Sequence, residues 1–433
     1  MSIEFVGLLV IIIMFILMFL RIPIAISMAV PSIIAIYLLR GEDALFGAIE
    51  SIIWSQSNNY NLITIPMFIL MGQLIFYSGI SEDLFTMFRK IIGRIRGGMA
   101  LATIGASGIF AAASGSSLAT TGTIGVIAAK EMLRNGYNKP LSGGAIAAGG
   151  TLGILIPPST MFIIYGMLTE QSIGHLLIAG ILPGIVLVIL FMLTIAIVTT
   201  INKDLAPKGE SYSWKEKILS LRHTFWILFL FIIVIGGMYA GIFTPTEASG
   251  AGAFGAFLIA LLKRKLTLKK MGEALAETLK TTGFIFSIVI GAFLLNYLLS
   301  ITRVPLLLEQ FLTNTTLPPM AIFACIILMY ILLGMVMESF AMIVVTIPIV
   351  LPVIQSLGFD LIWFGVVIVL VVEMALITPP VGINCFVLNG VVPELKLEQI
   401  FKGAFLFIIP ILVLIVLLVM FPEIALFLPE KMG

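Results

Sequence analysis

The sequence predicts an all-α polytopic membrane protein with about ten transmembrane helices and two re-entrant hairpins, arranged as two inverted repeats. Three observations support this: the composition, the length of the apolar segments and an internal repeat. Of the 433 residues, 60% are hydrophobic and 11% are charged, whereas soluble domains average ~45–50% apolar and ~25% charged residues. A net charge of +2 gives no field that would attract nucleic acid. The composition excludes a soluble enzyme and a disordered chain.

The apolar segments have the length of membrane spans, because a helix needs ~20 mainly apolar residues to cross the hydrocarbon core. We expect spans at 4–20, 23–40, 61–79, 141–167, 176–200, 223–240, 246–262, 283–300, 361–388 and 403–420. Two further apolar stretches, 98–138 and 319–358, are too long for one span and are interrupted near the middle. Irregular backbone at membrane depth is tolerated only where protein or water covers it. Both stretches are therefore interpreted as re-entrant hairpins.

Basic residues indicate the orientation. With the N-terminus outside, 21 of the 24 Lys and Arg residues fall on the inner side, leaving Arg40, Arg303 and Lys431 outside. This distribution follows the positive-inside rule. The C-terminus is then also outside, because ten spans is an even number. The first apolar segment lacks a basic flank and is interpreted as a retained span, not a cleaved signal peptide.

Polar linkers suggest the domain organisation. Segments 82–96 and 263–280 mix apolar and basic positions, which is typical of helices lying in the membrane interface, although solvated connectors would show the same mixture. The longest polar stretch separates two halves. We expect N-terminal scaffold helices at 1–60, a first repeat at 61–200, a cytoplasmic linker at 201–222, scaffold helices with an interfacial arm at 223–282, and a second repeat at 283–433.

The two halves share an internal repeat. Adding 222 to Ser117 gives Ser339, and the same offset takes Gly136 to Gly358 and Pro157-Pro158 to Pro379-Pro380. In the expected topology, the first hairpin enters from the cytoplasm and the second from outside. Inverted repeats of this kind are typical of secondary transporters.

The proline pairs lie in the middle of expected spans, in the segments Gly153–Ser159 and Thr378–Asn384. Tandem prolines remove backbone donors and clash with the preceding turn, so a helix has to break there. The freed carbonyls can bind a hard cation, and the N–H groups of the next half-helix can bind an anion. For either proline pair taken alone, the alternative to a binding site is a purely structural kink that binds no ligand.

The hairpin tips carry hydroxyl groups. Ser114, Ser116, Ser117, Thr120 and Thr121 lie at the first tip, and Ser339 lies at the second. Hydroxyl and carbonyl oxygens suit Na⁺, since hard cations favour oxygen ligands. The same side chains also occur in membrane helices as packing residues bonded to their own backbone. Both interpretations stay open for each residue alone.

Few acids lie within the apolar segments, and an ionised carboxylate there is costly enough to be a functional candidate. Glu338, at the second tip, could bind a cation or accept hydrogen bonds from the opposed half-helix. Glu373 is expected mainly to hold its broken helix in place. Glu247 follows Thr244 by three residues, which predicts a helix N-terminus.

Enzymatic signatures are absent from the sequence. There is no HExxH, GxSxG or GxxxxGK[ST] motif, and Cys325 and Cys385 form no metal or disulfide pattern. We therefore expect neither catalysis nor direct use of ATP.

Four segments resemble the large membrane subunit of tripartite ATP-independent periplasmic (TRAP) transporters. They are GTLGILIPPS at 150–159, GIFTPTEASG at 241–250, ESFAMIVVTIPIVLPV at 338–353 and ALITPPVGIN at 375–384. The resemblance implies an elevator-type fold of the ion transporter superfamily, with scaffold and transport domains. It also implies Na⁺-driven uptake of an organic acid that a soluble periplasmic binding protein delivers. A separate small four-helix membrane subunit is expected as a partner. The resemblance further implies a multi-pass protein of the bacterial inner membrane.

The resemblance also implies two Na⁺ sites. Ser116, Ser117, Gly153 and Pro157 would belong to the first, and Ser339, Thr378, Pro379 and Gly382 to the second. Ser114, Thr120, Ser159, Glu338, Glu373 and Asn384 are further candidates for binding substrate or ions. Glu338 departs from the family pattern, in which Asp is expected. The particular acid is not specified by the sequence.

Two other classes of function remain as alternatives. One is a stand-alone Na⁺/carboxylate symporter of the same superfamily, which needs no binding protein. The other is a channel or scaffold subunit, which the paired broken spans disfavour because they build occluded sites.

Overall fold

The computed structural model describes residues 2–335 and 337–432, and within these ranges it contains helices and no strand. The N-terminal half comprises α1 Ile3–Phe19, α2 Ile24–Arg40, α3 Glu42–Ser57, α4 Thr64–Tyr77, α5 Ile80–Ile92, α6 Gly98–Ser114, α7 Ser117–Arg134, α8 Lys139–Leu155, α9 Thr160–Thr169, α10 Ile173–Ala179 and α11 Ile181–Ile201. The C-terminal half comprises α12 Trp214–Tyr239, α13 Pro245–Leu262, α14 Leu268–Thr302, α15 Val304–Thr313, α16 Pro319–Gly334, α17 Ser339–Ser356, α18 Leu361–Ala375, α19 Ile383–Val391, α20 Leu397–Met420 and α21 Glu423–Glu430. The predicted all-α class is confirmed.

Apolar helices of spanning length are present, but their number differs from the expected ten. Within the described ranges, six helices are long and apolar enough to cross a membrane, or up to eight if each bent pair counts as one span. Several expected spans, among them 4–20 and 23–40, correspond to apolar helices of 17 residues, α1 and α2. Helix α17 is also long and apolar enough to cross a membrane, although we expected it as one arm of a hairpin. The exact number of spans stays a prediction.

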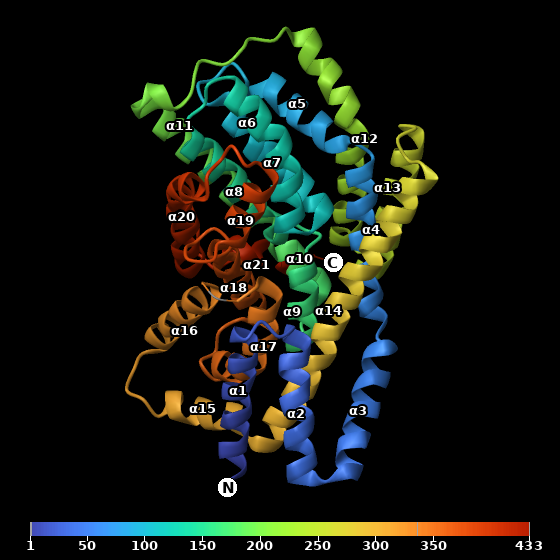
Figure 1. The fold of residues 1–433 in the computed structure, drawn as a ribbon, viewed down its shortest axis with the longest axis vertical. Coiled ribbons are helices and arrows are strands. Elements are labelled where there is room, and N and C mark those ends of the chain that lie inside the picture. The colour runs from blue at the N-terminus through green and yellow to red at the C-terminus, as the bar shows by residue number, and fades with distance from the viewer. Residues whose placement is uncertain (1, 336, 433) are drawn as a thin grey trace.

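Both expected hairpins form as helix–turn–helix units. In the first, α6 ends at Ser114, Gly115 adopts a left-handed conformation (φ +56°), and Ser116 caps α7. In the second, α16 is followed by α17, whose N-cap is Glu338. Figure 1 places α6 and α7 in its upper half and α16 and α17 in its lower half. The two helix pairs thus lie in opposite halves of the molecule.

The helices break at both proline pairs, as predicted. The first pair separates α8 from α9, whose axes differ by 42°. The second pair separates α18 from α19, so the expected span 361–388 is two helices. Both pairs contain a cis peptide bond. Each break interrupts the helical hydrogen-bond pattern, because proline has no N–H group to donate.

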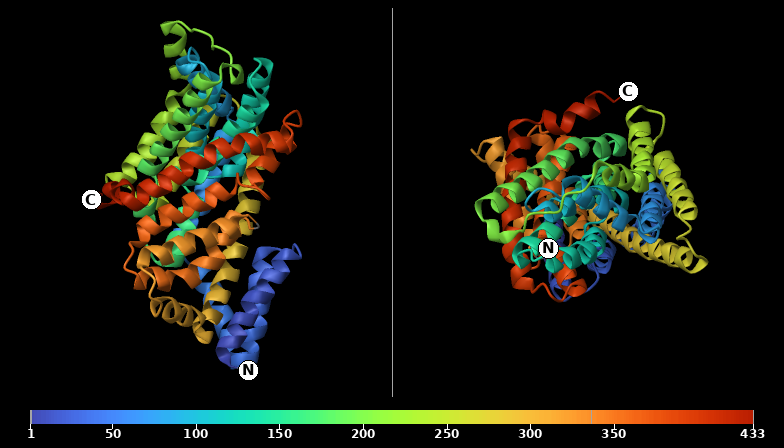
Figure 2. Two further views of the ribbon diagram at one scale, coloured as in Figure 1. Left: turned by 90° about the vertical axis from the view of Figure 1, so that its left-hand side faces the viewer. Right: turned by 90° about the horizontal axis from the view of Figure 1, so that it is seen from above.

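The interfacial arm expected at 263–280 is not a separate helix. Residues 268–302 form the single helix α14, so the arm continues directly into the expected span 283–300. The structure also contains α3, which was not predicted. Figure 2 shows the N-terminal helices (blue) beside one end of α14 (yellow), at the opposite end from the linker that precedes α12 (green).

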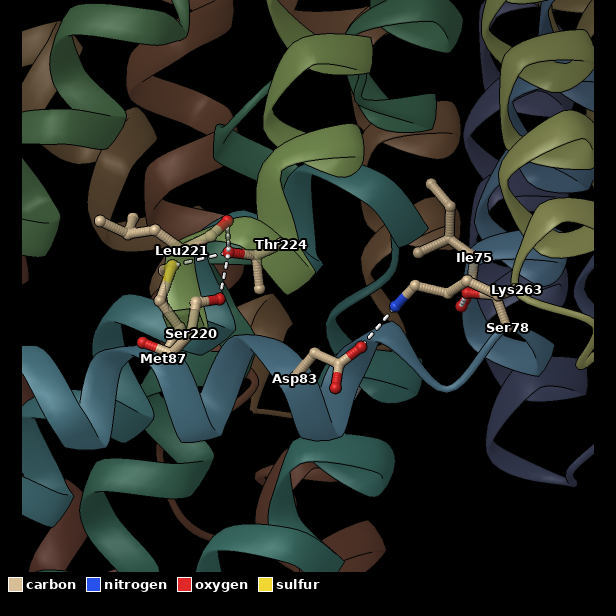
Figure 3. A network of polar contacts seen from close by, with 8 residues as sticks. All are labelled: Ile75, Ser78, Asp83, Met87, Ser220, Leu221, Thr224 and Lys263. Carbon is tan, nitrogen blue, oxygen red and sulfur yellow. Dashed lines mark hydrogen bonds and ion pairs between the residues drawn. The ribbon is translucent and has the colours of Figure 1, made fainter. Parts of the chain in front are cut away.

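Helix α5 is tied to the neighbouring helices by polar contacts (Figure 3). Asp83 pairs with Lys263, the C-cap residue of α13, and Thr224 of α12 donates to the sulfur of Met87 at 2.9 Å. On its other side, Arg89 donates to Glu131 of α7 at 2.6 Å. The sequence 82–96 thus folds mainly as an amphipathic helix that joins α12 and α13 to the first hairpin.

Glycines let α8 and α20 approach each other to backbone contact. A Cβ atom on Gly144 would overlap the backbone of Gly403, and a Cβ on Gly143 would lie 3.1 Å from the Cα of Ile400. Close packing of small residues is a recurrent way in which membrane helices associate. The glycine-rich start of α8 therefore serves helix packing on this face.

The inverted arrangement predicts opposite accessibility of the two hairpin exits. Asn135 follows α7 and Ser356 ends α17, and both side chains are exposed. After Cys325 and Cys385 are replaced by alanine, a membrane-impermeant thiol reagent added to intact cells should label S356C. It should label N135C only after the membrane is opened. Labelling of both from one side would contradict the inverted topology.

Candidate functional site

The tips of the two hairpins line one cavity of about 690 Å³. The first tip contributes Ser114 to Ser117, and the second contributes Glu338 to Phe340. Residues beside both helix breaks also line this cavity, namely Ile154 and Thr160 at the first break and Leu376 and Ile383 at the second. The two hairpin tips, which lie about half the chain apart in the sequence, therefore face the same cavity.

The first tip is held by its own hydroxyl groups. The Ser116 side chain accepts a hydrogen bond from the Ala119 N–H at 3.3 Å, which caps α7. Thr120 donates to the Ser116 carbonyl at 2.9 Å, and its hydroxyl also lies 2.9 Å from that of Ser114. These bonds favour a structural role for Ser114 and Thr120, because they fix the turn between the two helices.

The first tip also touches the first broken helix at backbone level. A Cβ atom on Gly153 would lie 2.9 Å from the carbonyl carbon of Ser116 and 3.0 Å from the Ser117 nitrogen. Thr160, just after the break, donates to the Gly115 carbonyl at 3.3 Å. Because only glycine permits this approach, the carbonyl groups of the tip lie against the end of α8. Three of the residues assigned to the first ion site are thus brought together, and Pro157 follows in the break itself.

A buried bond connects the two repeats. Ser117 donates to Oε2 of Glu373, 256 residues away, at 2.6 Å, and both side chains are buried. Glu373 was expected mainly to hold its own broken helix, but its hydrogen bond goes to the first hairpin instead. Asn384, on the other side of the second break, donates to the Ala147 carbonyl of α8 at 3.3 Å. The acid and the amide thus both bind the first repeat.

Glu338 caps its own helix. Its Oε2 accepts hydrogen bonds from the Phe340 N–H at 3.1 Å and the Ala341 N–H at 3.3 Å, both at the start of α17. These bonds go to its own helix and not to the opposed half-helix, which was one of the two roles considered for Glu338. The other role, binding of a cation, stays a prediction. A carboxylate at this position is favourable, since it meets the positive end of the helix dipole.

The residues assigned to the second ion site come from the start of α17 and from the break between α18 and α19. Ser339 begins α17 and lines the cavity. Thr378, just beyond the end of α18, donates to the Met374 carbonyl of that helix at 2.7 Å. Gly382 has φ +53° and precedes α19, so the turn after Pro379 depends on glycine at this position. Ser159 is the corresponding N-cap of α9, accepting from Phe162 N–H at 3.3 Å.

Part of the cavity wall was not expected from the sequence. Gln73 and Tyr77 of α4, Glu82 of α5, and Glu277 and Thr281 of α14 line it together with the tips. Among the described residues of the wall, three are glutamates and none is Lys or Arg. No motif marks these positions, because they come from elements outside the hairpins. Glu277 pairs with Lys280 at 2.7 Å, so a basic side chain lies beside the wall although it does not line it.

Comparison with protein families identifies the chain. Residues 11–424 match the family model described as the DctM component of the tripartite ATP-independent periplasmic transporter. The chain belongs to this family. The C4-dicarboxylate TRAP transporter large permease protein DctM of Pseudomonas aeruginosa is 34% identical over 88% of this chain and 89% of its own length. The sialic acid TRAP transporter large permease protein SiaM of Vibrio cholerae is 30% identical over 86% of this chain and 87% of its own length.

Solved structures show the same fold at low sequence identity. The chain is similar to the YdaH transporter of Alcanivorax borkumensis, with a TM-score of 0.67 and 12% identity over 89% of this chain and 90% of that one. It is also similar to MtrF of Neisseria gonorrhoeae, with a TM-score of 0.58 and 14% identity over 87% of this chain and 85% of that one. These likenesses concern the fold alone.

Membership of the TRAP family gives the general activity. Large permeases of this family take up solutes with a periplasmic binding protein, usually beside a small membrane subunit. In some relatives the two membrane subunits are fused. One is the isethionate permease DctMQ of Oleidesulfovibrio alaskensis, 31% identical, of which this chain covers 60%. The relatives that this chain matches are transporter permeases, which are not enzymes.

Proposed function

We propose that this chain performs Na⁺-coupled secondary uptake of an organic acid anion by an elevator-type alternating-access mechanism. The observation that carries the proposal is the cavity bounded by both hairpin tips and both broken helices. Opposed hairpins around a site in the middle of the fold allow each repeat to expose that site in turn. A channel would instead need a continuous open path.

Na⁺ is the proposed coupling ion. Ser116, Ser117, Gly153 and Pro157 form the first site, and the close approach at Gly153 supports it because main-chain oxygens are ligands for hard cations. Ser339, Thr378, Pro379 and Gly382 form the second. A charge crossing 100 mV yields ~2.3 kcal/mol, and a tenfold gradient adds ~1.4 kcal/mol per ion. Two ions therefore suffice to concentrate an anion strongly.

An organic acid is the proposed substrate. The relatives are named for C4-dicarboxylate, sialic acid and isethionate, which are all acids. Ser117 and Ser339 begin helices α7 and α17 at the cavity, and helix N-termini favour anions. Since Glu338 already accepts from two N–H groups of α17, Na⁺ bound near the tips supplies the remaining positive charge. The proposed partners are the binding protein and a separate small subunit, in the inner membrane.

The test is uptake into proteoliposomes that contain the full chain with its small subunit. Uptake should need both the binding protein and an inward Na⁺ gradient, and should proceed without ATP. Uptake that persists after K⁺ replaces Na⁺ would refute the coupling. Uptake that is equally fast without a binding protein would favour the stand-alone symporter instead.

Two serine variants test the ion sites individually. Ser117→Ala and Ser339→Ala should each raise the Na⁺ concentration for half-maximal uptake by about tenfold, since each removes one hydroxyl group from a buried tip. Ser249→Ala in α13 is the control, because its buried hydroxyl donates to the Thr246 carbonyl of its own helix. If both tip variants keep the wild-type half-saturation, the hydroxyl groups serve packing only.

A further inference from the structure

A second cavity, of about 630 Å³, lies between helix α1 and helix α16. Figure 1 shows both helices in its lower half. Phe15 and Phe19 of α1 line one side, and Leu328 and Leu332 of α16 line the other. Residues four positions apart share one face of a helix, so each wall is a continuous apolar stripe. The cavity thus separates the N-terminal helix from the second hairpin.

The lining of this cavity suits an apolar and flexible molecule. Its residues are apolar apart from Glu338 and the thiol of Cys325, so water inside would find few hydrogen-bond partners. Met18 and Met329 belong to the lining, and methionine side chains adapt to irregular apolar shapes. Because α1 and α16 are apolar helices of a membrane protein, the molecules at hand to fill the space are lipids.

A basic residue lies at the end of the cavity where α1 stops. Arg21 is in the turn between α1 and α2, and its neighbours Phe19 and Ile22 both line the cavity. Its side chain is exposed and has no ion pair among the described residues. In the orientation that the basic residues predict, this turn lies at the cytoplasmic surface. Anionic headgroups of that leaflet attract basic side chains.

The headgroup decides which lipid is preferred. An acyl chain gains little by moving from the bilayer into the cavity, because lipid tails are as apolar as the walls. A guanidinium group binds phosphate through charge-assisted hydrogen bonds, which are stronger than neutral ones. Selectivity for one lipid over another therefore has to come from Arg21 and not from the apolar stripes.

We propose that this cavity binds one acyl chain of an anionic phospholipid whose phosphate pairs with Arg21. This inference goes beyond the proposed function and does not depend on Na⁺ coupling. The acyl chain lies between α1 and α16 and reaches the second hairpin tip. Glu338 at that tip lines both this cavity and the one between the hairpin tips. The lipid thus covers the membrane side of the tip.

The experiment maps bound lipid by photo-crosslinking. The full chain with its small subunit is placed in phosphatidylcholine nanodiscs that contain phosphatidylglycerol with a diazirine group at the end of one acyl chain. Labelled peptides are identified by mass spectrometry. Labelling of α1 and α16 should exceed that of α11, where Leu193 is 50% exposed and reports contact with bulk lipid. Equal labelling of α16 and α11 would overturn the proposal, leaving bulk lipid or a covering protein segment as the occupant.

Filling the cavity tests the position of the acyl chain. Leu328→Trp places a bulky ring between the two stripes and should remove most of the labelling of α1. Leu193→Trp is the matched control, because Leu193 and Leu328 are similarly exposed, at 50% and 55%. That variant should leave the labelling of α1 unchanged. Wild-type labelling of α1 in Leu328→Trp would overturn the proposal.

A charge variant tests the headgroup and keeps the proposal testable if Leu328→Trp fails to fold. Arg21→Gln should lower labelling by the phosphatidylglycerol probe about fivefold, as expected for one basic residue near an anionic headgroup. It should affect the corresponding phosphatidylcholine probe much less. Arg40→Gln, at the exposed end of α2, is the control. Equal effects of Arg21→Gln on the two probes would overturn the proposal. None of these measurements involves Na⁺ or the acid, so their failure would leave the proposed function standing.

Discussion

A Gly153→Ala variant should lose about nine-tenths or more of its Na⁺-dependent uptake while still inserting into the membrane. The added methyl group would lie 2.9 to 3.0 Å from backbone atoms of Ser116 and Ser117. Backbone cannot rotate away as a flexible side chain can, so the tip of the first hairpin has to move. Coordination of a cation depends on oxygen positions to within a few tenths of an ångström, so a shift of this kind removes the proposed first site.

The measurement is initial uptake rate against Na⁺ concentration in proteoliposomes. Gly283→Ala in α14 is the control, because nothing lies within 4 Å of its added methyl group. That variant should transport like the wild type. Wild-type Na⁺ dependence in Gly153→Ala would show that the approach of α8 to the tip has no part in ion binding.

A Gly144→Leu variant should be unstable, because α8 and α20 are in backbone contact at this point. Even a Cβ atom on Gly144 would overlap the backbone of Gly403. In the same way, a Cβ atom on Gly403 would overlap the Pro140 carbonyl of α8. Overpacking of a tight contact costs about 1–3 kcal/mol and sometimes more, and leucine adds three carbons beyond the Cβ. The helices would have to separate along their shared length.

Thermal denaturation in detergent, followed by the amount of monodisperse protein, measures this effect. Gly144→Leu should lower the apparent melting temperature by several degrees or prevent recovery of folded protein. Gly272→Ala in α14 is the control, since its methyl group would meet nothing within 4 Å and alanine favours a helix. An unchanged melting temperature in Gly144→Leu would contradict the packing described here.

The sequence predicted the structural elements that depend only on residues close together in the chain, namely helix breaks, a helix cap and turns. The proline pairs broke their helices because the cause lies in the prolines themselves. The Thr244–Glu247 pattern forms a capping box at the start of α13 for the same reason. The hairpin turns at Ser114–Ser117 and at Glu338 also follow from short polar segments between apolar ones. These elements required no knowledge of distant contacts.

Long-range pairing could not be predicted in this way. The offset of 222 relates Ser117 to Ser339, yet Ser117 bonds to Glu373, whose repeat-equivalent position is Thr151. Thr151 donates to its own helix instead, so this contact is not repeated in the other half. A local contact is repeated, since Asn138 caps α8 and Asp360, 222 residues later, caps α18 in the same way. The close approach of Thr121 and Asn384 to Gly150 likewise depends on the packing of α7, α8 and α19. The continuity of α14 reflects the lack of a helix-breaking residue between the arm and the span.

The coupling of Na⁺ to the solute is the central claim, and simultaneous flux measurement tests it most directly. Radioactive Na⁺ and a labelled organic acid are followed together in proteoliposomes that contain the full chain, with the binding protein outside. The proposed mechanism predicts that Na⁺ enters only when the acid and the binding protein are present, in a fixed ratio of more than one Na⁺ per acid. Na⁺ entry that does not depend on the acid, or acid entry that continues without Na⁺, would contradict it.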